Sequence, residues 1–409
     1  MNRVTFEMIE QAEQNLKPII KQTDLHYANH LSEETKGEVY LKLENLQLSG
    51  SFKIRGAYNK MLHLTDAEKQ QGVVASSAGN HAQGVAISAT KLGIKSTIVM
   101  PKNAPFAKVN ATRKYGAEVV LEGEIYDEAY QKAMHIKELT NATFVHPFND
   151  PYVIAGQGTI GIEMLQKQPD LDIVFVPIGG GGIAAGVALA VKTLNPSVKV
   201  IGVQSENAPS MYEALKCDRV EKINVKKTIA DGIAVACPGT DTYPLIKQYV
   251  DEIITVTDTQ ISQAILFLLE TCNLVCEGAG AVTVAAILAT KEKLENKKVA
   301  AILSGGNIDT NLIESIINHA MMSSGRRTEI KLSIEDRPGE LTKFLDTIAN
   351  EFANIVSIRQ SRYRQGLSMY ALGVTAVVET IDAAHKQRVM QKLEANGYHV
   401  RYTNMEDNL

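Results

Sequence analysis

The chain has 409 residues, more than one ordinary core accommodates, which predicts two or three domains. Apolar residues make up 45% and charged residues 22%, a composition typical of a folded globular protein. A formal net charge of −4, from 46 acidic and 42 basic residues, argues against a nucleic-acid-binding surface. No apolar run is long enough to span a bilayer, and the first residues carry no apolar signal segment. We therefore expect a cytoplasmic enzyme or binding protein with no membrane or nucleic-acid partner.

From about residue 38 to residue 304, short β-branched runs alternate with helical stretches. Several runs are apolar almost throughout, as strands buried on both faces of a parallel sheet should be. Residues 126–139 and 260–272 show apolar spacing of about 3.6 residues, which predicts helices. The alternation predicts an α/β fold in which helices cover parallel sheets and ligands gather at strand ends. The predicted strands are residues 38–43, 72–76, 95–100, 117–121, 172–178, 198–204 and 298–304.

The segment LSGSFKIRG, residues 48–56, places Lys53 where a turn becomes a helix. The positive end of a helix dipole disfavours a cation at such a position. One interpretation is a lysine that is neutral and nucleophilic. The other is an ordinary first-turn lysine whose stem packs while its ammonium group reaches water. The segment alone favours the second interpretation.

Three later strand ends are rich in glycine and small polar residues. SSAGNHAQG, residues 76–84, offers hydroxyls, an amide and backbone N–H groups that could converge on a small anion. PIGGGGIAAG, residues 177–186, places four consecutive glycines before a helix, which lets backbone amides approach a phosphate. AILSGGNID, residues 301–309, puts the Ser304 hydroxyl at a strand end facing the same crevice. Each segment could instead be a turn or a helix cap.

The sequence changes character near residues 319–329, a polar segment that we interpret as a linker. Beyond it, EIKLSI predicts a strand, DRPGELTKFLDTIAN a helix, and NIVSIRQSRY and LSMYALGVTAVV two strands joined by a hairpin turn at Gln365-Gly366. Residues 382–395 predict a second helix, followed by a turn at Asn396-Gly397 and a last strand, YHVRY. The βαββαβ order predicts a ferredoxin-like domain for ligand sensing or assembly.

The motifs SGSFKIRGA, SSAGNHAQG, GGGGI and SGGN stand in the order found in fold type II pyridoxal-phosphate enzymes, the tryptophan synthase β-subunit family. DPYVIAGQGTIGIE and TIADGIAV make residues 5–320 similar to the threonine dehydratases within it. The tail resembles the ACT-like regulatory domain of the biosynthetic members, in one copy. The resemblance implies a two-lobed catalytic domain over residues 1–320 and an ACT-like domain over residues 326–409.

The resemblance also implies a role for each motif. Lys53 would hold pyridoxal 5′-phosphate covalently and later take the substrate Cα proton, with Phe52 beside it. Asn80 would hydrogen-bond the ring oxygen of the cofactor. Ser304 would face the pyridine nitrogen, and a neutral hydroxyl there favours elimination over transamination. The phosphate would lie on Gly179, Gly180, Gly181 and Gly182, and the substrate carboxylate on the loop formed by Ser76, Ser77, Ala78, Gly79 and His81.

Two departures from relatives narrow the expected chemistry. Serine racemases carry a serine two positions before the asparagine of the second motif, where this chain has Ala78, so the acid needed for racemisation is missing. Gln204 and Ser210 stand where a racemase-like metal site would need carboxylates, so we expect no divalent-metal site. The sequence leaves open whether the protein binds a monovalent cation. Four cysteines are too few to indicate a disulfide framework at this length.

We therefore expect a lyase that converts L-threonine to 2-oxobutanoate and ammonia, the entry to isoleucine biosynthesis. Isoleucine and valine are the expected effectors, and we expect a homo-oligomer, a dimer or a tetramer. Three alternatives remain open at this point. They are a dehydratase that prefers L-serine, a β-replacing relative such as a cysteine synthase, and a catalytically silent amino-acid sensor.

Overall fold

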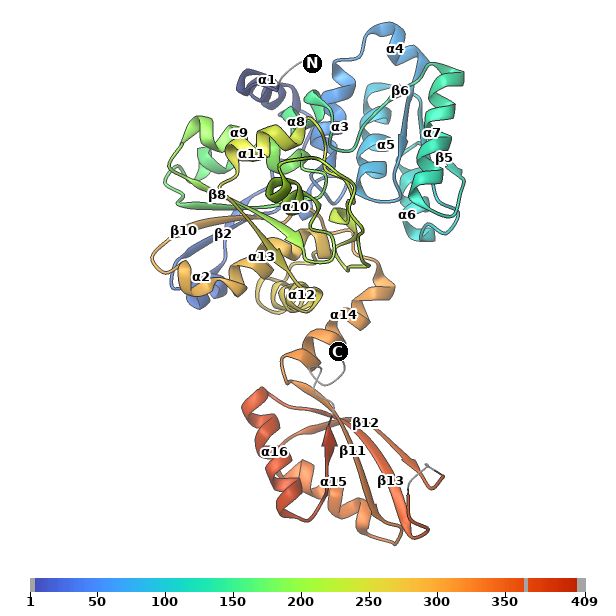
Figure 1. Ribbon diagram of the computed structural model, residues 1–409, viewed down its shortest axis with the longest axis vertical. Coiled ribbons are helices and arrows are strands. Elements are labelled where there is room, and N and C mark those ends of the chain that lie inside the picture. Colours follow the sequence, from blue (N-terminus) through green and yellow to red (C-terminus); the bar gives the residue numbers. More distant parts are fainter. Residues whose placement is uncertain (1–3, 364–366, 403–409) are drawn as a thin grey trace. The chain divides into compact units, whose positions relative to one another are not determined.

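The computed structural model describes residues 4–363 and 367–402, and the chain divides into two compact units, Met1–Asp309 and Thr310–Leu409 (Figure 1). The polar segment 319–329, interpreted above as a linker, is instead the end of helix α14 (Thr310–Ser323), a short turn, and the start of strand β11 (Arg327–Glu335). The serines, glycine and arginines at the C-terminal end of this segment gave it the composition of a linker. Among the described residues, no helix combines the length and apolar content needed to cross a bilayer.

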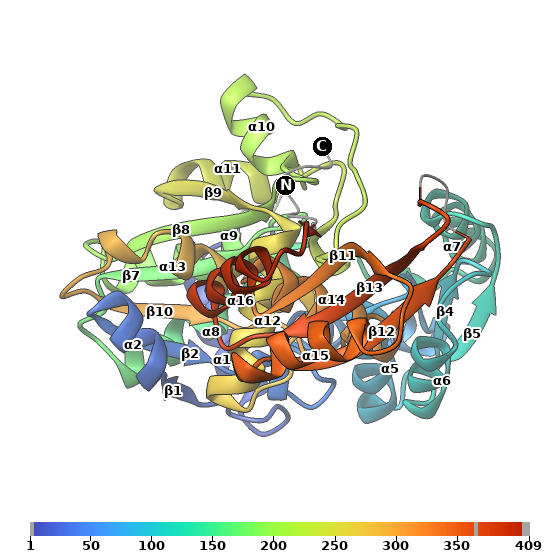
Figure 2. The same cartoon turned by 90° about the horizontal axis from the view of Figure 1, so that it is seen from below.

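The larger lobe of the first unit is built on a six-stranded sheet. Its strands pair in parallel, except for the edge strand β1, which is antiparallel. Figure 2 shows the strands side by side in the order β1-β2-β10-β7-β8-β9. Their bounds are β1 (Leu25–Tyr27), β2 (Glu38–Lys42), β7 (Ile173–Pro177), β8 (Lys199–Ser205), β9 (Glu252–Val256) and β10 (Lys298–Ile302).

Helices cover both faces of this sheet (Figure 1). One face packs on the helices that share the main apolar core, and the opposite face packs on α13 and its neighbours. The first group is α1 (Phe6–Leu16), α8 (Pro151–Lys167), α9 (Gly182–Leu194) and α11 (Thr242–Tyr249), and the second is α2 (Asn29–Thr35), α12 (Asp258–Cys272) and α13 (Gly278–Ala289). Helix α10 (Ser210–Cys217) and the short 3-10 turns η1 (Glu44–Leu46), η2 (Asp231–Ile233) and η3 (Lys291–Lys293) complete the lobe.

The smaller lobe carries a four-stranded parallel sheet in the order β5-β4-β3-β6. Helices α3 and α5 share an apolar core with one face of this sheet, while α7 packs on the other face. The strands are β3 (Val73–Ser76), β4 (Ser96–Met100), β5 (Glu118–Leu121) and β6 (Thr143–Phe144). The helices are α3 (Lys53–Leu62), α4 (Asp66–Gln71), α5 (Asn80–Leu92), α6 (Phe106–Lys114) and α7 (Tyr126–Thr140).

The second unit is a four-stranded antiparallel sheet in the order β12-β13-β11-β14 with two helices on one face (Figure 1). This βαββαβ arrangement confirms the predicted ferredoxin-like fold, and the two lobes above confirm the parallel-sheet α/β class. The last strand begins at Arg401, three residues later than the predicted YHVRY, and the predicted turn at Gln365-Gly366 lies outside the described residues. The elements are α15 (Glu340–Asn350), β12 (Asn354–Ser361), β13 (Ala371–Glu379), α16 (Ala383–Ala395) and β14 (Arg401–Tyr402).

Helix α3, which begins at Lys53, packs closely on α5. A Cβ atom added to Gly84 in α5 would lie 3.0 Å from the carbonyl carbon of Lys53. Because only a residue without Cβ lets the two backbones approach so closely, Gly84 holds the first turn of α3 against the loop that precedes α5.

A buried ion network fixes the other side of α3. The fully buried Arg55 guanidinium donates from Nη2 to Glu44 Oε1 at 2.7 Å and from Nη1 to Glu163 Oε1 at 2.6 Å. Lys42 Nζ donates to Glu163 Oε2 at 2.6 Å. Burial alone would raise the pKa of Glu163, but the adjacent Arg55 and Lys42 charges hold it below its usual value. The network ties β2, η1, α3 and α8 together.

Replacing Arg55 with methionine should lower the free energy of unfolding of the first unit by about 3–5 kcal/mol, because two buried carboxylates would lose their shared partner. Urea denaturation followed by circular dichroism measures the change. Lys199→Met is the matched control, since its ion pair with Glu252 at 2.6 Å is about half exposed and should contribute at most about 1 kcal/mol. Equal destabilisation by both substitutions would contradict the role given to the buried network.

Candidate active site

A cavity of about 870 Å³ lies between the two lobes of the first unit, where strands β3, β7 and β10 end. Parallel strands direct their carboxyl ends to the same edge, so loops far apart in sequence meet there. Every residue that the sequence analysis selected for the site lines this cavity. They are Phe52, Lys53, Ser76, Ser77, Ala78, Gly79, Asn80, His81, Gly179, Gly180, Gly181, Gly182 and Ser304.

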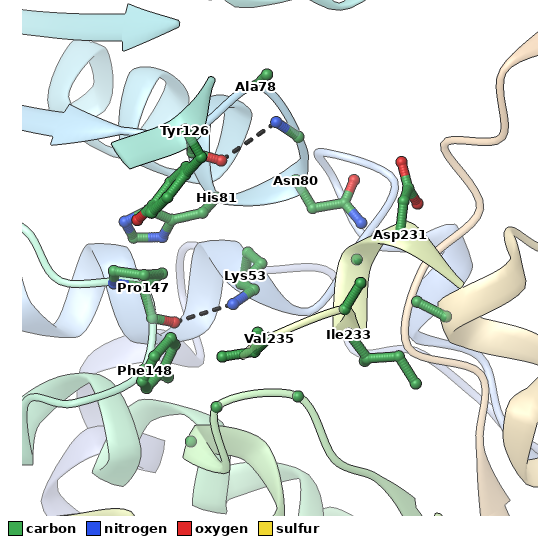
Figure 3. Close-up of a pocket in the computed structure, with 18 of the residues that line it drawn as sticks. Lys53, Ala78, Asn80, His81, Tyr126, Pro147, Phe148, Asp231, Ile233 and Val235 are labelled. Atoms are coloured by element: carbon green, nitrogen blue, oxygen red, sulfur yellow. Dashed lines mark hydrogen bonds between the residues drawn. The ribbon is translucent and has the colours of Figure 1, made fainter. Parts of the chain in front are cut away.

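The Lys53 amine lies inside the cavity, with His81 and Asn80 on one side and Phe148 and Val235 on the other (Figure 3). Its Nζ donates a hydrogen bond of 2.9 Å to the carbonyl of Pro147 and lies 5.1 Å from the centre of the Phe52 ring. Burial lowers the pKa of Lys53 to about 8, although the nearby Glu277 opposes this shift. A substantial fraction of the amine is therefore neutral near physiological pH, as a nucleophile or base requires.

Two histidines beside Lys53 are neutral. Burial, followed by the charge of Lys53, lowers the pKa of His81 to about 3, and the same two causes lower the pKa of His146 to about 4. His81 Nε2 lies 2.8 Å from the Val145 carbonyl, which only accepts, so Nε2 carries the proton. His146 Nδ1 accepts from the backbone amides of Phe148 and Asn149. Sequence analysis did not select His146, which follows the short strand β6 without a recognisable motif.

The glycine loop after β7 leads directly into α9. Gly181 has φ +99°, a conformation that favours glycine, and Gly182 is the first residue of the helix. The Thr242 hydroxyl donates to the Gly180 carbonyl at 2.7 Å, which fixes the position of the loop. First-turn N–H groups of a helix have no intrahelical partners, so this loop and helix start can bind a phosphate through backbone amides.

The loop between β3 and α5 offers a second anion site. Ser76 Oγ is buried and has no hydrogen-bond partner among the described residues, while Ser77 Oγ accepts from the Gly79 amide at 3.2 Å. The loop runs into the N-terminus of α5, whose dipole favours negative charge. The hydroxyl at the end of β3 and the helix start that follows it together fit a small carboxylate.

Ser304 follows β10 and is almost fully buried. Its hydroxyl makes a long hydrogen bond of 3.3 Å to the Ala279 carbonyl at the start of α13. The group it presents to the cavity is therefore a neutral hydroxyl rather than a carboxylate.

The segment that would hold a racemase-like metal is occupied by protein contacts. Gln204 Nε2 donates to the carbonyls of Ile178 and Ala208, and its Oε1 accepts from the Tyr212 amide. Over the part of the chain that the structure describes, no cluster of three or more metal-ligating side chains occurs.

Sequence reasoning also missed Glu277 and Asn307, which surround Asn80. Asn80 Nδ2 donates to Glu277 Oε1 at 2.6 Å, and Asn307 Nδ2 donates to Asn80 Oδ1 at 2.7 Å. Asn307 lies within the SGGN motif, but only Ser304 of that segment was selected. Glu277 directly precedes the glycine-rich start of α13. Acidic residues are common at this position because they stabilise the helix dipole, so the sequence did not mark Glu277 as a site residue.

A partly neutral lysine, a glycine cradle at a helix start, an anion loop and a neutral hydroxyl fit a phosphorylated aldehyde cofactor, which the lysine amine binds covalently. The cavity thus defines an enzyme of the pyridoxal-phosphate class. The family of pyridoxal-phosphate dependent enzymes matches residues 16–305 of the chain.

Comparison with known proteins agrees with the assignment to the pyridoxal-phosphate enzymes. The chain is 52% identical to an L-threonine ammonia-lyase of Thermotoga maritima over 398 residues, 97% of this chain and 99% of that protein. The processed form of threonine deaminase isoform 2 from Solanum lycopersicum superposes with a TM-score of 0.75 at 37% identity, covering 77% of this chain and 93% of that one. Maize serine racemase superposes with a TM-score of 0.73 at 33% identity, covering 77% of this chain and 98% of that one. The chain belongs to the pyridoxal-phosphate dependent enzymes, its cofactor is pyridoxal 5′-phosphate, and the family resemblance drawn from its motifs is confirmed.

Replacing Gly181 with alanine should weaken the binding of pyridoxal 5′-phosphate about tenfold while leaving the affinity for pyridoxal, which lacks the phosphate, nearly unchanged. The added Cβ would lie 2.6 Å from Thr242 Oγ1 at a positive φ, a strain of about 1–3 kcal/mol that would shift the loop amides. Equilibrium titration of the cofactor-free protein measures both affinities.

Gly93→Ala is the control for this experiment, because Gly93 also has a positive φ of +67° and faces open space, but it follows α5 and does not line the cavity. Its affinity for both ligands should match that of the unmodified protein. If Gly181→Ala weakens both ligands equally, the loop does not hold the phosphate.

Proposed function

We propose that this chain is an L-threonine ammonia-lyase that converts L-threonine to 2-oxobutanoate and ammonia. The observation that carries the proposal is the Lys53 amine, which is partly neutral and lies between the glycine cradle and the anion loop. The full-length similarity to the Thermotoga maritima L-threonine ammonia-lyase supports the same substrate.

The substrate carboxylate is proposed to lie on the loop between β3 and α5, where the Ser76 hydroxyl has no partner in the part of the chain that the structure describes. Because His81 beside this loop is neutral, hydroxyls and backbone N–H groups of the loop are the proposed partners of the carboxylate. With its carboxylate held there, the amino acid presents its Cα atom to the Lys53 amine.

Lys53 is proposed to take the Cα proton. When bound, the cofactor withdraws electrons from Cα and so acidifies its proton. The Pro147 carbonyl holds the lysine amine in place. Because the pKa of Lys53 is lowered, a fraction of the amine is neutral and can accept a proton near physiological pH. Water exclusion by the surrounding apolar side chains, including Phe148, Ile233 and Val235, strengthens the electrostatic interactions inside the cavity.

Ser304 and Ala78 favour elimination over the reactions of relatives. A hydroxyl at the proposed position of the pyridine nitrogen would leave the bound ring largely unprotonated, which would favour prompt loss of the β-hydroxyl. Ala78 has no proton to deliver from the second face of Cα, which separates this chain from the racemases to which it is structurally similar.

Lys53→Ala should abolish threonine turnover, a loss of several orders of magnitude in kcat, because the same amine supplies covalent attachment and the base. Lys53→Arg is the matched variant, since it keeps a cation at this position but offers no neutral amine. Both variants should fold, shown by an unchanged circular dichroism spectrum, and both should lack the visible absorption of the lysine-bound cofactor. Substantial formation of 2-oxobutanoate by either variant would refute the assignment.

We propose that the second unit is an ACT-like regulatory domain that binds isoleucine, with valine as an opposing effector, and that the reaction opens isoleucine biosynthesis. A cavity of about 480 Å³ lies at the turn between β11 and α15 and is lined by Asp336 and Arg337. Gly339, at φ +91°, precedes the first residue of α15. The backbone N–H groups at this helix start suit an amino-acid carboxylate.

Gly339→Ala should raise the isoleucine concentration needed for half-inhibition about tenfold while leaving threonine turnover near its normal rate. Alanine is strained at this φ and would move the turn, although its methyl group meets open space. Gly397→Ala is the matched control, because Gly397 has a similar φ of +86°, also faces open space, and lies after α16.

Steady-state rates measured against isoleucine concentration provide this test. Equal loss of isoleucine sensitivity in both variants would mean that general backbone strain, and not a ligand site at the β11–α15 turn, causes the loss. A full-length enzyme that ignores millimolar isoleucine and valine would refute the sensing role and leave the second unit as an assembly module.

We propose that the enzyme acts in the cytoplasm as a homo-oligomer, a dimer or a tetramer. The four cysteines, Cys217, Cys237, Cys272 and Cys276, are all free, which suits a reducing compartment. The edge strand β12 exposes Val356 and Ile358, side chains that a neighbouring subunit would cover. Analytical ultracentrifugation of the full chain tests the assembly.

A further inference from the structure

Three side chains from distant segments form one hydrogen-bonded chain at the edge of the cavity. Asn80 lies at the start of α5, Glu277 directly before α13, and Asn307 after β10. Asn307 donates to Asn80, and Asn80 donates to Glu277, as described above. Asn80 and Glu277 both line the cavity, and Figure 3 shows the Asn80 amide directed toward the side of the cavity where Asp231 lies.

A backbone carbonyl determines the direction of every hydrogen bond in this chain. Asn307 Nδ2 also donates to the carbonyl of Ser49 at 2.8 Å. Since a carbonyl only accepts, the nitrogen of the Asn307 amide must face Ser49 and Asn80. The oxygen of the Asn80 amide must then accept from Asn307, which directs its nitrogen toward Glu277. An amide nitrogen carries two hydrogens, so one N–H of Asn80 remains after the bond to Glu277.

We propose that Glu277 is a positioning residue of this active site, which together with Asn307 orients the Asn80 amide so that its remaining N–H faces the bound cofactor. The proposal rests on the proposed role of Asn80 as the hydrogen-bond partner of the cofactor ring. Glu277 acts through Asn80 and does not itself react.

The carboxyl group of Glu277 is held firmly enough for this role. The residue is buried, and its backbone amide donates to the Gly305 carbonyl at 3.1 Å. A Cβ atom added to Gly305 would lie 2.2 Å from Glu277 Oε1, so the absence of a side chain at Gly305 creates the space that the carboxyl occupies. The Asn80 amide would otherwise rotate freely about its last side-chain bond.

The charge of Glu277 changes near neutral pH. Burial is the main cause that raises the pKa of Glu277 to about 7, and Asp231 on η2 adds to the rise. The bond from Asn80 and the charges of Lys108 on α6 and Lys53 on α3 oppose it. Below this pH Glu277 is a neutral acid, and above it a carboxylate that accepts a stronger, charge-assisted bond from Asn80. The donor strength of the remaining Asn80 N–H therefore follows the protonation of Glu277.

The experiment compares the holoenzyme with its Glu277→Gln and Glu277→Leu variants. Glutamine keeps an oxygen that accepts from Asn80 but does not titrate, whereas leucine removes the acceptor. The readouts are the visible absorption spectrum of the bound cofactor on both sides of pH 7 and the affinity for pyridoxal 5′-phosphate. For Glu277→Leu we expect about tenfold weaker cofactor binding, and for Glu277→Gln an affinity close to that of the unmodified enzyme.

The pH dependence separates positioning from a merely structural role. We expect a spectral transition near pH 7 in the unmodified enzyme and none in Glu277→Gln. Asp231→Asn should move the transition to lower pH, because it removes a negative charge that raises the pKa of Glu277 without touching Asn80. Asn307→Leu leaves Glu277 in place but frees the Asn80 amide, so it should weaken cofactor binding as Glu277→Leu does, even if the latter fails to fold.

Two results would overturn the proposal. One is a spectral transition in Glu277→Gln that matches the unmodified enzyme, and the other is unchanged cofactor affinity in both Glu277→Leu and Asn307→Leu. Neither readout depends on threonine turnover. An enzyme that shows the expected spectra but does not consume threonine would refute the proposed substrate and leave the role of Glu277 intact.

Discussion

The placement of the reactive lysine depends on the buried ion network around Arg55. This guanidinium bridges Glu44, which follows β2 of the large lobe, and Glu163 in α8, and it lies two residues after Lys53. Taking such charges out of water is costly, so the network is stable only when all its partners are present. The first turn of α3 consequently has one position relative to the large lobe. On its opposite side, the close approach at Gly84 brings the same turn to the anion loop.

This rigid placement lets burial set the protonation of the groups in the cavity. Lys53 and His81 lie together, and each loses the water that would stabilise its charged form, so their pKa values fall to about 8 and about 3. Glu277 is shifted in the opposite direction for the same physical reason, because burial disfavours the anion as it disfavours the cation. The cavity thus holds less charge near neutral pH than its side chains would carry in water, which suits chemistry that moves a proton between carbon and nitrogen.

Local signals accounted for most of the elements. Buried strands such as β3 and β7 read as short apolar runs, and α7 and α12 follow an apolar period near their predicted bounds. Prediction was wrong where local pattern and tertiary packing disagree. Polar composition concealed the C-terminal part of α14, and β14 begins three residues later than its apolar alternation suggested, because its described pairing with β11 starts at Arg401.

The sequence by itself determined the order of strands and helices, the three glycine-rich strand ends and the lysine at a helix start, because turn chemistry and hydrophobic period are local properties. Tertiary structure alone decided that the pKa of Lys53 is lowered to about 8, since desolvation comes from residues distant in the chain. It also decided the partners of Asn80. Glu277 and Asn307 lie 197 and 227 positions away along the chain, and no spacing rule connects them. They meet because the carboxyl ends of β3 and β10, which belong to different sheets, and the segment between α12 and α13 all border the same cavity.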